Sequence, residues 1–338
     1  MSVIIGWDIG GVHLKAVRAE EGRIVKAAQY ASPLRSGTEQ LQEAFAQARK
    51  DMGRGDRNVI TMTGELADIF LSRQDGVEQL SLLAERELEN VSVYAGPSGF
   101  VARAEARRHC TEIASANWHA SAAVVAKKHK AALFIDVGST TTDVVPIAEG
   151  RVASRGYTDA QRLATGELVY TGLVRSFVMA TAARAPLSGR WTTLINENFA
   201  TMADVHRIRG TLPPGADLMA TADGREKSVP ASRARLARMS GSDAGQTDSR
   251  SWELLANWFA EAQIRSVTDA VMLVMSGCVP TSTGPVIAAG IGVGLVAEVA
   301  RRLGLSWQRF DELLEVVPEA RDAVCQCAPA AALTALAA

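Results

Sequence analysis

The chain opens with Val3-Ile-Ile-Gly-Trp-Asp-Ile-Gly-Gly-Val-His-Leu-Lys15, an apolar run, a glycine turn and a partly alternating run. This pattern predicts two paired strands around a tight turn. A similar unit returns where a buried run from Ala131 ends in Asp136-Val-Gly-Ser and alternation resumes at Asp143. Because the order strand, Asp-x-Gly, strand, glycine turn, strand occurs at residues 3–30 and 131–157, we expect two duplicated lobes.

The two glycine turns predict a clamp for phosphate and metal. Glycine at a turn lets backbone N–H groups approach phosphate oxygens, because no Cβ intervenes. Carboxylates at strand ends suit Mg²⁺, so Asp8 and Asp136 are the metal candidates. The expected phosphate-binding residues and nearby hydroxyl donors are Gly10, Gly11, Gly138, Ser139, Thr140, Thr141 and Thr142. One Asp-Gly alone is explained by a hairpin turn, but two copies one lobe apart favour the clamp.

Length and charge point to two domains and a small ligand. At 338 residues the chain exceeds the size at which one hydrophobic core stops growing. We expect an N-terminal lobe over residues 1–128 and a C-terminal lobe over 129–338. The net charge is -1, from 36 Lys and Arg against 37 Asp and Glu. No overall basic field favours nucleic acid or anionic membrane, so small-molecule substrates are the expected partners.

Targeting and cysteine patterns predict a reduced, cytoplasmic protein. The start of the chain lacks the basic, apolar and small-residue regions of a signal peptide. The most apolar stretch, Val286 to Val299, is interrupted by glycines and is expected to be a core strand and helix. The four cysteines are too sparse for a disulfide framework or a zinc site. They are Cys110, Cys278, Cys325 and Cys327.

Three further segments carry expectations about local structure. Residues 105–128 have a helical pattern and are expected to form one helix. Residues 184–250 are rich in turn formers and predict a loop-rich insert in the second lobe. A late glycine-rich motif at 286–294 contains Gly290-Ile-Gly-Val-Gly, which fits neither a dinucleotide-binding fingerprint nor a phosphate loop with Lys. Its alternative explanation is close helix–strand packing.

The order of these motifs resembles the superfamily of sugar kinases, actin and heat-shock chaperones. The resemblance implies an α/β, actin-like (ribonuclease H-like) fold of two duplicated lobes with a cleft between them. It also implies ATP or ADP as a ligand, with Gly290 and Gly292 facing an adenosine. Two departures weaken a kinase interpretation: Val12-His13 replaces the Thr or Ser that often follows the first turn, and Ala116-Asn117-Trp118-His119 lacks the carboxylate or Gln often found in the connecting helix.

Longer stretches resemble one family within that superfamily, the hydantoinase A/oxoprolinase-related proteins linked to tetrahydromethanopterin one-carbon metabolism. These stretches begin at Gly6, Met62, Tyr94, Ala114, Gly166 and Phe199. The resemblance implies a transferase of methanofuran-type cofactor biosynthesis. Such an enzyme condenses an aminomethylfuran methyl diphosphate with a tyramine- or tyrosine-derived phenol and releases diphosphate.

That reaction needs diphosphate neutralised and a base near the phenol. The candidates for these tasks are His13, Lys15, Glu65, Asn117, His119 and Glu167. Each has a structural alternative: a core histidine at 119, a solvated lysine at 15, a helix-capping carboxylate at 65 and packing at 167. In the insert, Arg235 and Arg238 are candidates for an anion or for surface pairing. A second metal or amine site there would use Asn196, Glu197, Asp204, His206, Asp217 and Asp223.

Two alternatives from other classes stay open on the sequence alone. One is an ATP-dependent kinase or a hydantoinase/oxoprolinase-like hydrolase, and the other is a nucleotide-gated regulator without catalysis. A homodimer is also left open.

Overall fold

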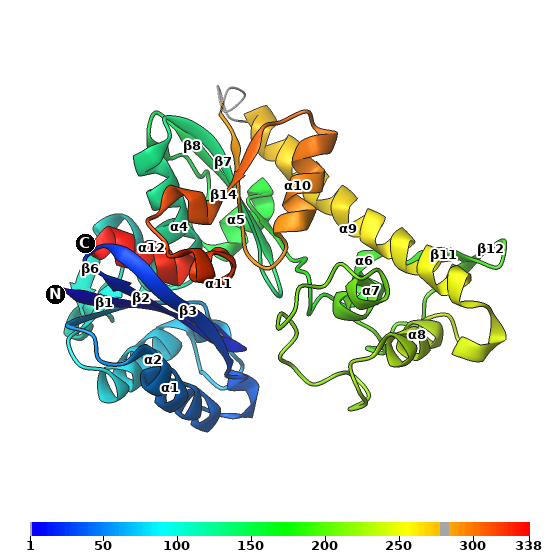
Figure 1. Cartoon of the computed structure of the whole chain (residues 1–338), viewed down its shortest axis with the longest axis horizontal. Helices are drawn as coiled ribbons and strands as arrows, with labels where there is room; N and C mark the ends of the chain where they lie inside the picture. The colour runs from blue at the N-terminus through cyan, green and yellow to red at the C-terminus, as the bar shows by residue number, and fades with distance from the viewer. Residues whose placement is uncertain (1, 278–283) are drawn as a thin grey trace.

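The computed structural model describes residues 2–277 and 284–338, and its first sheet follows the opening hairpin. The strand order is β3-β2-β1-β4-β5-β6, with β1 antiparallel to β2 and parallel to β4. The strands are β1 (Val3–Ile9), β2 (His13–Glu20), β3 (Arg23–Ala31), β4 (Arg57–Met62), β5 (Val91–Tyr94) and β6 (Phe100–Ala102). In Figure 1, α1 (Glu39–Met52) and α2 (Arg73–Glu87) lie along one side of this sheet.

The second sheet repeats this plan around Asp136. Its order is β10-β8-β7-β13-β14, with β9 also pairing β8. As in the first sheet, a hairpin comes first and a later strand then pairs parallel to its first strand. The strands are β7 (Ala131–Val137), β8 (Thr142–Ala148), β9 (Arg151–Val152), β10 (Leu168–Val169), β13 (Val286–Ala289) and β14 (Trp307–Arg309). The duplicated, two-lobed α/β fold is therefore confirmed.

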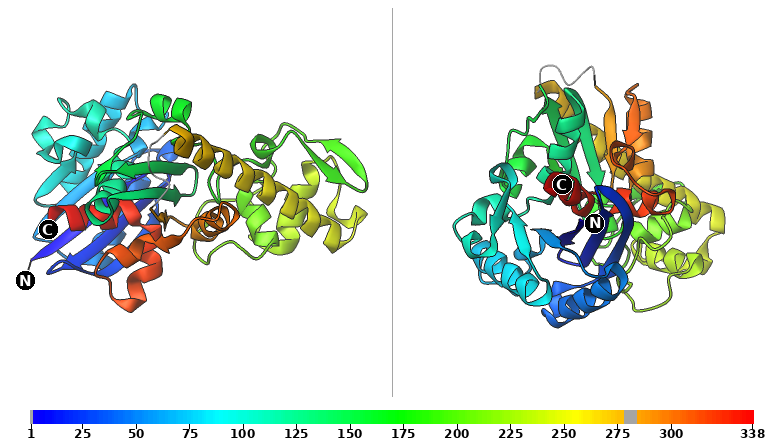
Figure 2. Two further views of the ribbon diagram at one scale, coloured as in Figure 1. Left: turned by 90° about the horizontal axis from the view of Figure 1, so that it is seen from above. Right: turned by 60° about the vertical axis from the view of Figure 1, so that its left-hand side comes forward.

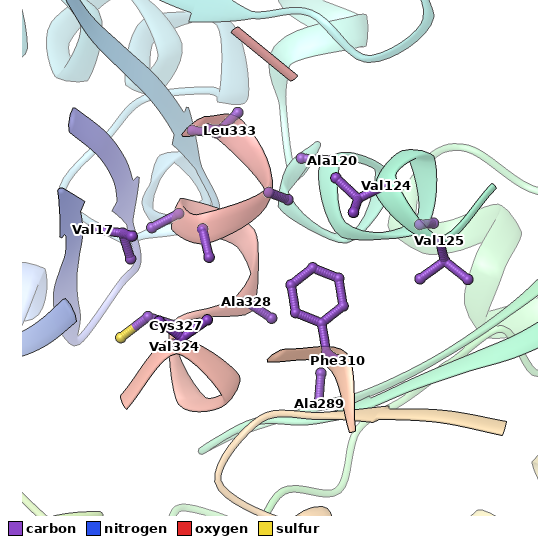
Figure 3. Packing of buried hydrophobic residues seen from close by; sticks show 14 of the residues in the cluster. Val17, Ala120, Val124, Val125, Ala289, Phe310, Val324, Cys327, Ala328 and Leu333 are labelled. Carbon is purple, nitrogen blue, oxygen red and sulfur yellow. The ribbon is translucent and has the colours of Figure 1, made fainter. Parts of the chain in front are cut away.

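Two helices lie between the sheets and join them. The helix α12 (Ala328–Ala337) packs on β1, β2 and β4, although it ends the chain, and it also contacts α4 (Asn117–Lys128), which packs on β7, β8 and β9. Figure 3 shows Leu333, Val124 and Phe310 around this shared core. A side chain at Gly6 would collide with the Ala330 carbonyl, so this glycine admits α12 against the sheet. The C-terminal helix α12 thus covers the first sheet.

The expected single helix over residues 105–128 is wrong. The structure has α3 (Cys110–Ile113) and α4, separated by Ser115 with a positive φ of 55°. The Ser115 hydroxyl donates to the buried Glu65 carboxylate at 2.8 Å. This tertiary hydrogen bond accompanies a local backbone conformation that a continuous helix does not allow.

The insert is a helical unit with its own core. It contains α6 (Val178–Thr181), β11 (Arg184–Leu187), β12 (Arg190–Thr193), α7 (Met202–Ile208) and α8 (Val229–Arg238). Their apolar side chains, such as Met202 and Leu236, pack on the first turns of α9 (Ser249–Gly277) around Trp252 and Phe259. Figures 1 and 2 show this unit projecting from the two lobes along α9. The expected loop-rich character fits residues 209–228, which contain no helix or strand, while the short helices supply the core of the insert.

The remaining helices complete the lobes. They are α5 (Asp159–Thr165), α10 (Val293–Arg302) and α11 (Arg321–Gln326). Within residues 2–277 and 284–338, no helix combines the length and apolarity needed to cross a bilayer.

Candidate functional site

A cavity of about 650 Å³ is lined by both glycine hairpins and by segments of both lobes. Most of the predicted site residues meet there. They are Asp8, Gly10, Gly11, His13, Lys15, Asn117, Asp136, Gly138, Ser139, Thr140 and Thr141. Residues 128 positions apart in the chain therefore contribute to one site.

The first hairpin places a cation beside its carboxylate. Asp8 and Lys15 are opposite each other in the strand pairing, and Lys15 Nζ lies 3.5 Å from Asp8 Oδ2. Burial raises the pKa of Asp8, while Lys15 and Asn117 oppose that rise. Burial disfavours the charge of Lys15, but Asp8 and Asp136 outweigh it and raise the lysine pKa. Lys15 is therefore a permanent cation at this end of the cavity.

The second hairpin places two carboxylates opposite each other. Asp136 and Asp143 are partners in the pairing of β7 and β8. Burial raises the pKa of Asp136 to about 7 against the opposing charge of Lys15, and the charges of Asp143 and Asp8 contribute to the rise. Asp143 has a partner of its own, because Arg162 donates to it at 2.8 Å while stacking 4.0 Å above the Trp118 ring. Asp136 lacks a comparable arginine among the described residues.

His13 offers a neutral ring nitrogen to the cavity. Its side chain is only 5% exposed, and its Nε2 atom has no hydrogen-bond partner among the described residues. Burial, helped by the positive charges of Lys15 and Arg175, lowers the pKa of His13 to about 4. The imidazole is therefore neutral at neutral pH and able to accept a proton.

A loop after β10, residues 170–177, forms another wall of the cavity and was not predicted. Val174 N and Arg175 N both donate to the Ser139 carbonyl, at 3.2 and 2.8 Å. A Cβ at Gly172 would lie 2.5 Å from Ser139 C and Thr140 N, so only glycine allows this close approach. The segment Gly166-Glu-Leu-Val-Tyr-Thr-Gly172 was the available sequence signal, but it did not reveal the role of Arg175.

Gln263 of α9 holds loop 170–177 in place by hydrogen bonds. Its Nε2 donates to Thr171 Oγ1 and to the Gly172 carbonyl, both at 2.9 Å. Its Oε1 lies 2.9 Å from His206 Nε2, whose other ring nitrogen lies 2.9 Å from Thr211 Oγ1. Since the Gln263 oxygen accepts, His206 carries its proton on Nε2. His206 therefore belongs to a structural network, and burial lowers its pKa to about 4.

Two predicted catalytic residues, Glu65 and His119, are not among the cavity-lining residues. The carboxylate of Glu65 accepts from Ser115, and burial raises its pKa. His119 Nδ1 lies 2.8 Å from the hydroxyl of Tyr94, and burial, helped by the charge of Arg162, lowers the histidine pKa to about 4. His119 matches its structural alternative of a packed histidine, whereas Glu65, expected to cap a helix, is instead buried against Ser115.

Glu167 also has a structural role in the second lobe. Its carboxylate accepts from the Ser154 hydroxyl at 2.6 Å and from the backbone N–H groups of Arg155 and Gly156 at 2.6 and 3.0 Å. These bonds hold the turn before α5, and Glu167 is not among the cavity-lining residues. The carboxylate stabilises a loop instead of facing a substrate.

Gly290 and Gly292 pack against the second hairpin. Side chains there would collide with Asp136 and Val137, and the two N–H groups donate to the carbonyls of Cys325 and Val137 at 2.9 and 3.0 Å. Neither glycine lines the cavity. Close packing explains the motif in this structure, as the alternative explanation proposed.

The polar set of the insert forms ion pairs. Arg235 pairs with Asp204 at 2.8 Å and with Asp223 at 3.0 Å. Asp217 pairs with Arg207, while Arg238 lies 3.9 Å from Asp223 at the surface. Arg235 is thus engaged by carboxylates and is not available to a phosphate. Asn196 and Glu197 do not line the cavity.

The donor set of the cavity fits a magnesium ion held together with phosphate. Asp8 and Asp136 both line it, and the buried Asp8 Oδ1 has no hydrogen-bond partner in the described part of the chain. No group of three or more His, Cys, Asp or Glu side chains is arranged for a metal among residues 2–277 and 284–338. Mg²⁺ commonly uses one or two carboxylates, waters and substrate phosphates.

The fold and the cavity define the class: an actin-like, two-lobed protein with a ligand cleft between its duplicated hairpins. The nucleotide-free structure of acetone carboxylase supports the fold alone, with a TM-score of 0.59 and 12% identity, covering 97% of this chain and 70% of that one. A sequence model of the hydantoinase/oxoprolinase family matches residues 56–310. The chain belongs to the hydantoinase/oxoprolinase family.

Two curated relatives share one name, (4-{4-[2-(gamma-L-glutamylamino)ethyl]phenoxymethyl}furan-2-yl)methanamine synthase. The protein from Methanocaldococcus jannaschii is 30% identical over 239 residues, covering 70% of this chain and 71% of that protein. The protein from Methanococcus vannielii is 30% identical over 117 residues, covering 35% of this chain and 52% of that protein. The relatives of this chain are thus enzymes that are named for an aryl ether product.

Proposed function

We propose that this protein is a cytoplasmic transferase of methanofuran-type cofactor biosynthesis. It would join an aminomethylfuran methyl diphosphate to the phenol of a tyramine derivative. The observation that carries the proposal is the 30% identity with the Methanocaldococcus jannaschii synthase across 70% of this chain. The name of that relative describes a phenoxymethyl link between a γ-glutamylaminoethyl phenol and a furan methanamine.

The proposed reaction forms one bond and breaks another. The phenol oxygen bonds to the furan methylene carbon, the bond from that carbon to the diphosphate oxygen breaks, and the phenol proton passes to a base. Because the furan ring stabilises positive charge on the methylene, the protein mainly has to neutralise diphosphate and align the phenol. Both tasks suit a cavity with a cation at one end and a neutral base beside it.

The hairpins supply the groups for the leaving diphosphate. Lys15 provides a permanent positive charge, and the glycine turns at Gly10 and Gly138 bring backbone close to the cavity. Asp8 and Asp136 would hold Mg²⁺, which when bound supplies further neutralisation of diphosphate charge. Val12 in place of a hydroxyl residue matters little here, since the transferred group is a carbon.

His13 is the base that this geometry favours. Its Nε2 atom is buried, unpartnered among the described residues and part of the cavity lining, and its ring is neutral at neutral pH. The low pKa comes partly from two nearby cations, so a bound diphosphate anion would offset them and raise the basicity of the ring. The base thus becomes effective when the leaving group is in place.

Mass spectrometry of the products tests the proposal. The purified protein is incubated with aminomethylfuran methyl diphosphate, γ-glutamyltyramine and Mg²⁺, and a parallel reaction receives EDTA. We expect a phenoxymethyl ether and one equivalent of diphosphate. Another parallel reaction supplies ATP with the phenol, and ADP release without ether formation would favour the kinase alternative and reject the transferase.

A further inference from the structure

An arginine of the second lobe lacks a charge partner inside the cavity. Arg175 Nη1 donates to Thr140 Oγ1 at 3.2 Å, and in the described part of the chain no ion pair involves Arg175 and no carboxylate is among the groups that shift its pKa. Arg175 is half-buried and belongs to the cavity lining. A partly desolvated guanidinium without a carboxylate is a natural receptor for an incoming anion.

A second arginine reaches the same cavity from the first lobe. Arg35 lines the cavity and is 73% exposed, with only a loose contact of 4.0 Å to the exposed Asp68. The charge of Arg35 adds to burial in lowering the pKa of Arg175, so the two cations repel each other across the cleft. An anion between them would remove this repulsion and join the two lobes.

Aromatic rings flank Arg175 in the chain. Tyr170 is 66% exposed and Phe177 is 39% exposed, and both line the cavity. From the opposite lobe Leu66, 46% exposed, lines the same space. Exposed rings in a concave site provide apolar surface for an aromatic ligand.

The loop that carries these side chains is already held in place. Gly172 N donates to Ser176 Oγ at 2.7 Å, and Gln263 donates to Thr171 and Gly172 from outside the loop. The backbone of Arg175 is bonded to the second hairpin. A preordered loop loses less conformational entropy on binding, so the side chains are suited to recognition.

We propose that loop 170–177 and Arg35 form the subsite for an acceptor that combines an aromatic ring with a carboxylate. The ring packs on Tyr170 and Phe177, and the carboxylate lies between Arg175 and Arg35. This inference rests on the proposed function and deepens it. His13 lines the same cavity as Lys15 and Arg175, and the charges of both cations act on its ring.

The test compares γ-glutamyltyramine with its α-methyl ester, which differs in the charge of one carboxylate. For the wild type we expect a KM at least about tenfold lower for the acid, because a charge-assisted pair is lost in the ester. Arg175→Gln is expected to raise the KM of the acid about tenfold or more and to leave the KM of the ester within about twofold. Because the charge of Arg175 also acts on His13, kcat is compared between acid and ester, and the ratio of the two should stay unchanged. Arg175→Lys should recover part of the preference.

Controls separate this subsite from the leaving-group site. Arg151→Gln, at an exposed arginine outside the cavity, should match the wild type. Calorimetry with inorganic diphosphate should give the same Kd for the wild type and Arg175→Gln. If Arg175→Gln instead weakens diphosphate binding and affects acid and ester equally, Arg175 belongs to the leaving-group site and the inference is rejected. Circular dichroism unfolding curves confirm that each variant is folded.

Failure of the proposed function gives a different result. If the wild type forms no ether, direct calorimetric binding of the acid and the ester still decides the subsite. A preference for the acid that is lost in Arg175→Gln supports the anion subsite without the transferase. If the wild type binds the acid and the ester with equal affinity, the proposal of an anion subsite is rejected.

Discussion

The two glycine hairpins have the same pairing but opposite electrostatics. In the first, the residue opposite Asp8 is Lys15, whereas in the second the residue opposite Asp136 is Asp143. The first hairpin therefore neutralises its own carboxylate. The second sets two carboxylates side by side, an arrangement that is unfavourable unless a cation compensates for it.

Arg162 compensates only one of the two carboxylates of the second hairpin. It pairs with Asp143, which leaves Asp136 with a pKa raised to about 7 by burial and neighbouring charge. The two hairpins thus share a backbone plan but differ in chemistry. The first holds the cation Lys15, whereas the second holds the carboxyl group of Asp136 without an arginine beside it among the described residues. Variants of both hairpins and a change of pH would break or sharpen this contrast.

The largest effect is expected from Asp136→Asn. Removing this carboxylate removes a ligand for the cation that neutralises the diphosphate, so kcat should fall about 100- to 1000-fold. Ether formation measured by mass spectrometry checks this, and calorimetry should show weakened Mg²⁺ binding. Asp269→Asn, which alters an exposed ion pair on α9, is the matched control. An unchanged kcat in Asp136→Asn would remove this residue from the site.

Lys15→Met should give the next largest effect, on stability. This substitution removes the cation beside Asp8. The Asp8 side chain is only 3% exposed and the Lys15 side chain 22% exposed, so the remaining carboxylate would be buried without its cation. We expect the free energy of unfolding in urea to fall by about 2 kcal/mol. Adding Asp8→Asn should restore most of this loss, because no unpaired charge remains. A double variant less stable than Lys15→Met would show that the pair is not coupled.

Gly172→Ala tests the close contact between loop 170–177 and the second hairpin. Gly11→Ala is the matched variant in the first hairpin. The added methyl at 172 meets backbone atoms of Ser139 and Thr140, so unfolding should become easier by about 2 kcal/mol. At Gly11 no atom lies within 4 Å of the added Cβ, and stability should change by less than about 0.5 kcal/mol. Thermal unfolding measures both.

Gly11→Ala should nevertheless weaken binding of inorganic diphosphate, because its methyl group would obstruct backbone contact with a phosphate. Calorimetry measures this change. An unchanged diphosphate Kd would indicate that the ligand does not approach Gly11.

The pH dependence of stability should show the smallest effect. With its pKa raised to about 7, Asp136 keeps its proton in the folded state after the unfolded chain has lost it. Stability from this group is therefore greatest at low pH and falls as pH rises through 7. Between pH 6 and pH 8 the wild type should lose about 1 kcal/mol relative to Asp136→Asn. Urea unfolding at the two pH values, without metal, checks this, and parallel pH curves would contradict it.

Much of the cleft could be predicted because its signals are local. A run of apolar residues followed by Asp-x-Gly forms a hairpin from short-range sterics and pairing, and this occurs at both Asp8 and Asp136. The repeat of the unit then predicts the duplicated fold. The residues in or beside the turns, including His13 and Lys15, line the cavity because the hairpins place them there.

Residues with less local roles were harder to predict. Glu167 and His119 have the side chains of catalytic residues, but their partners, Ser154 and Tyr94, are known only from the folded chain. Arg175 gave no local signal at all, since its lack of a carboxylate partner is a property of its surroundings.

By itself, the sequence determined the two hairpins, their aspartates and the duplication, because strand alternation and glycine turns act over a few neighbouring residues. Only the tertiary structure decided that Lys15 would face Asp8 while Asp143 found Arg162, and that α12 would return to the first sheet. Ionisation and charge pairing depend on burial and on neighbours far away in the chain. The chemistry of the cleft therefore depends on the packing of the lobes around hairpins that the sequence had already specified.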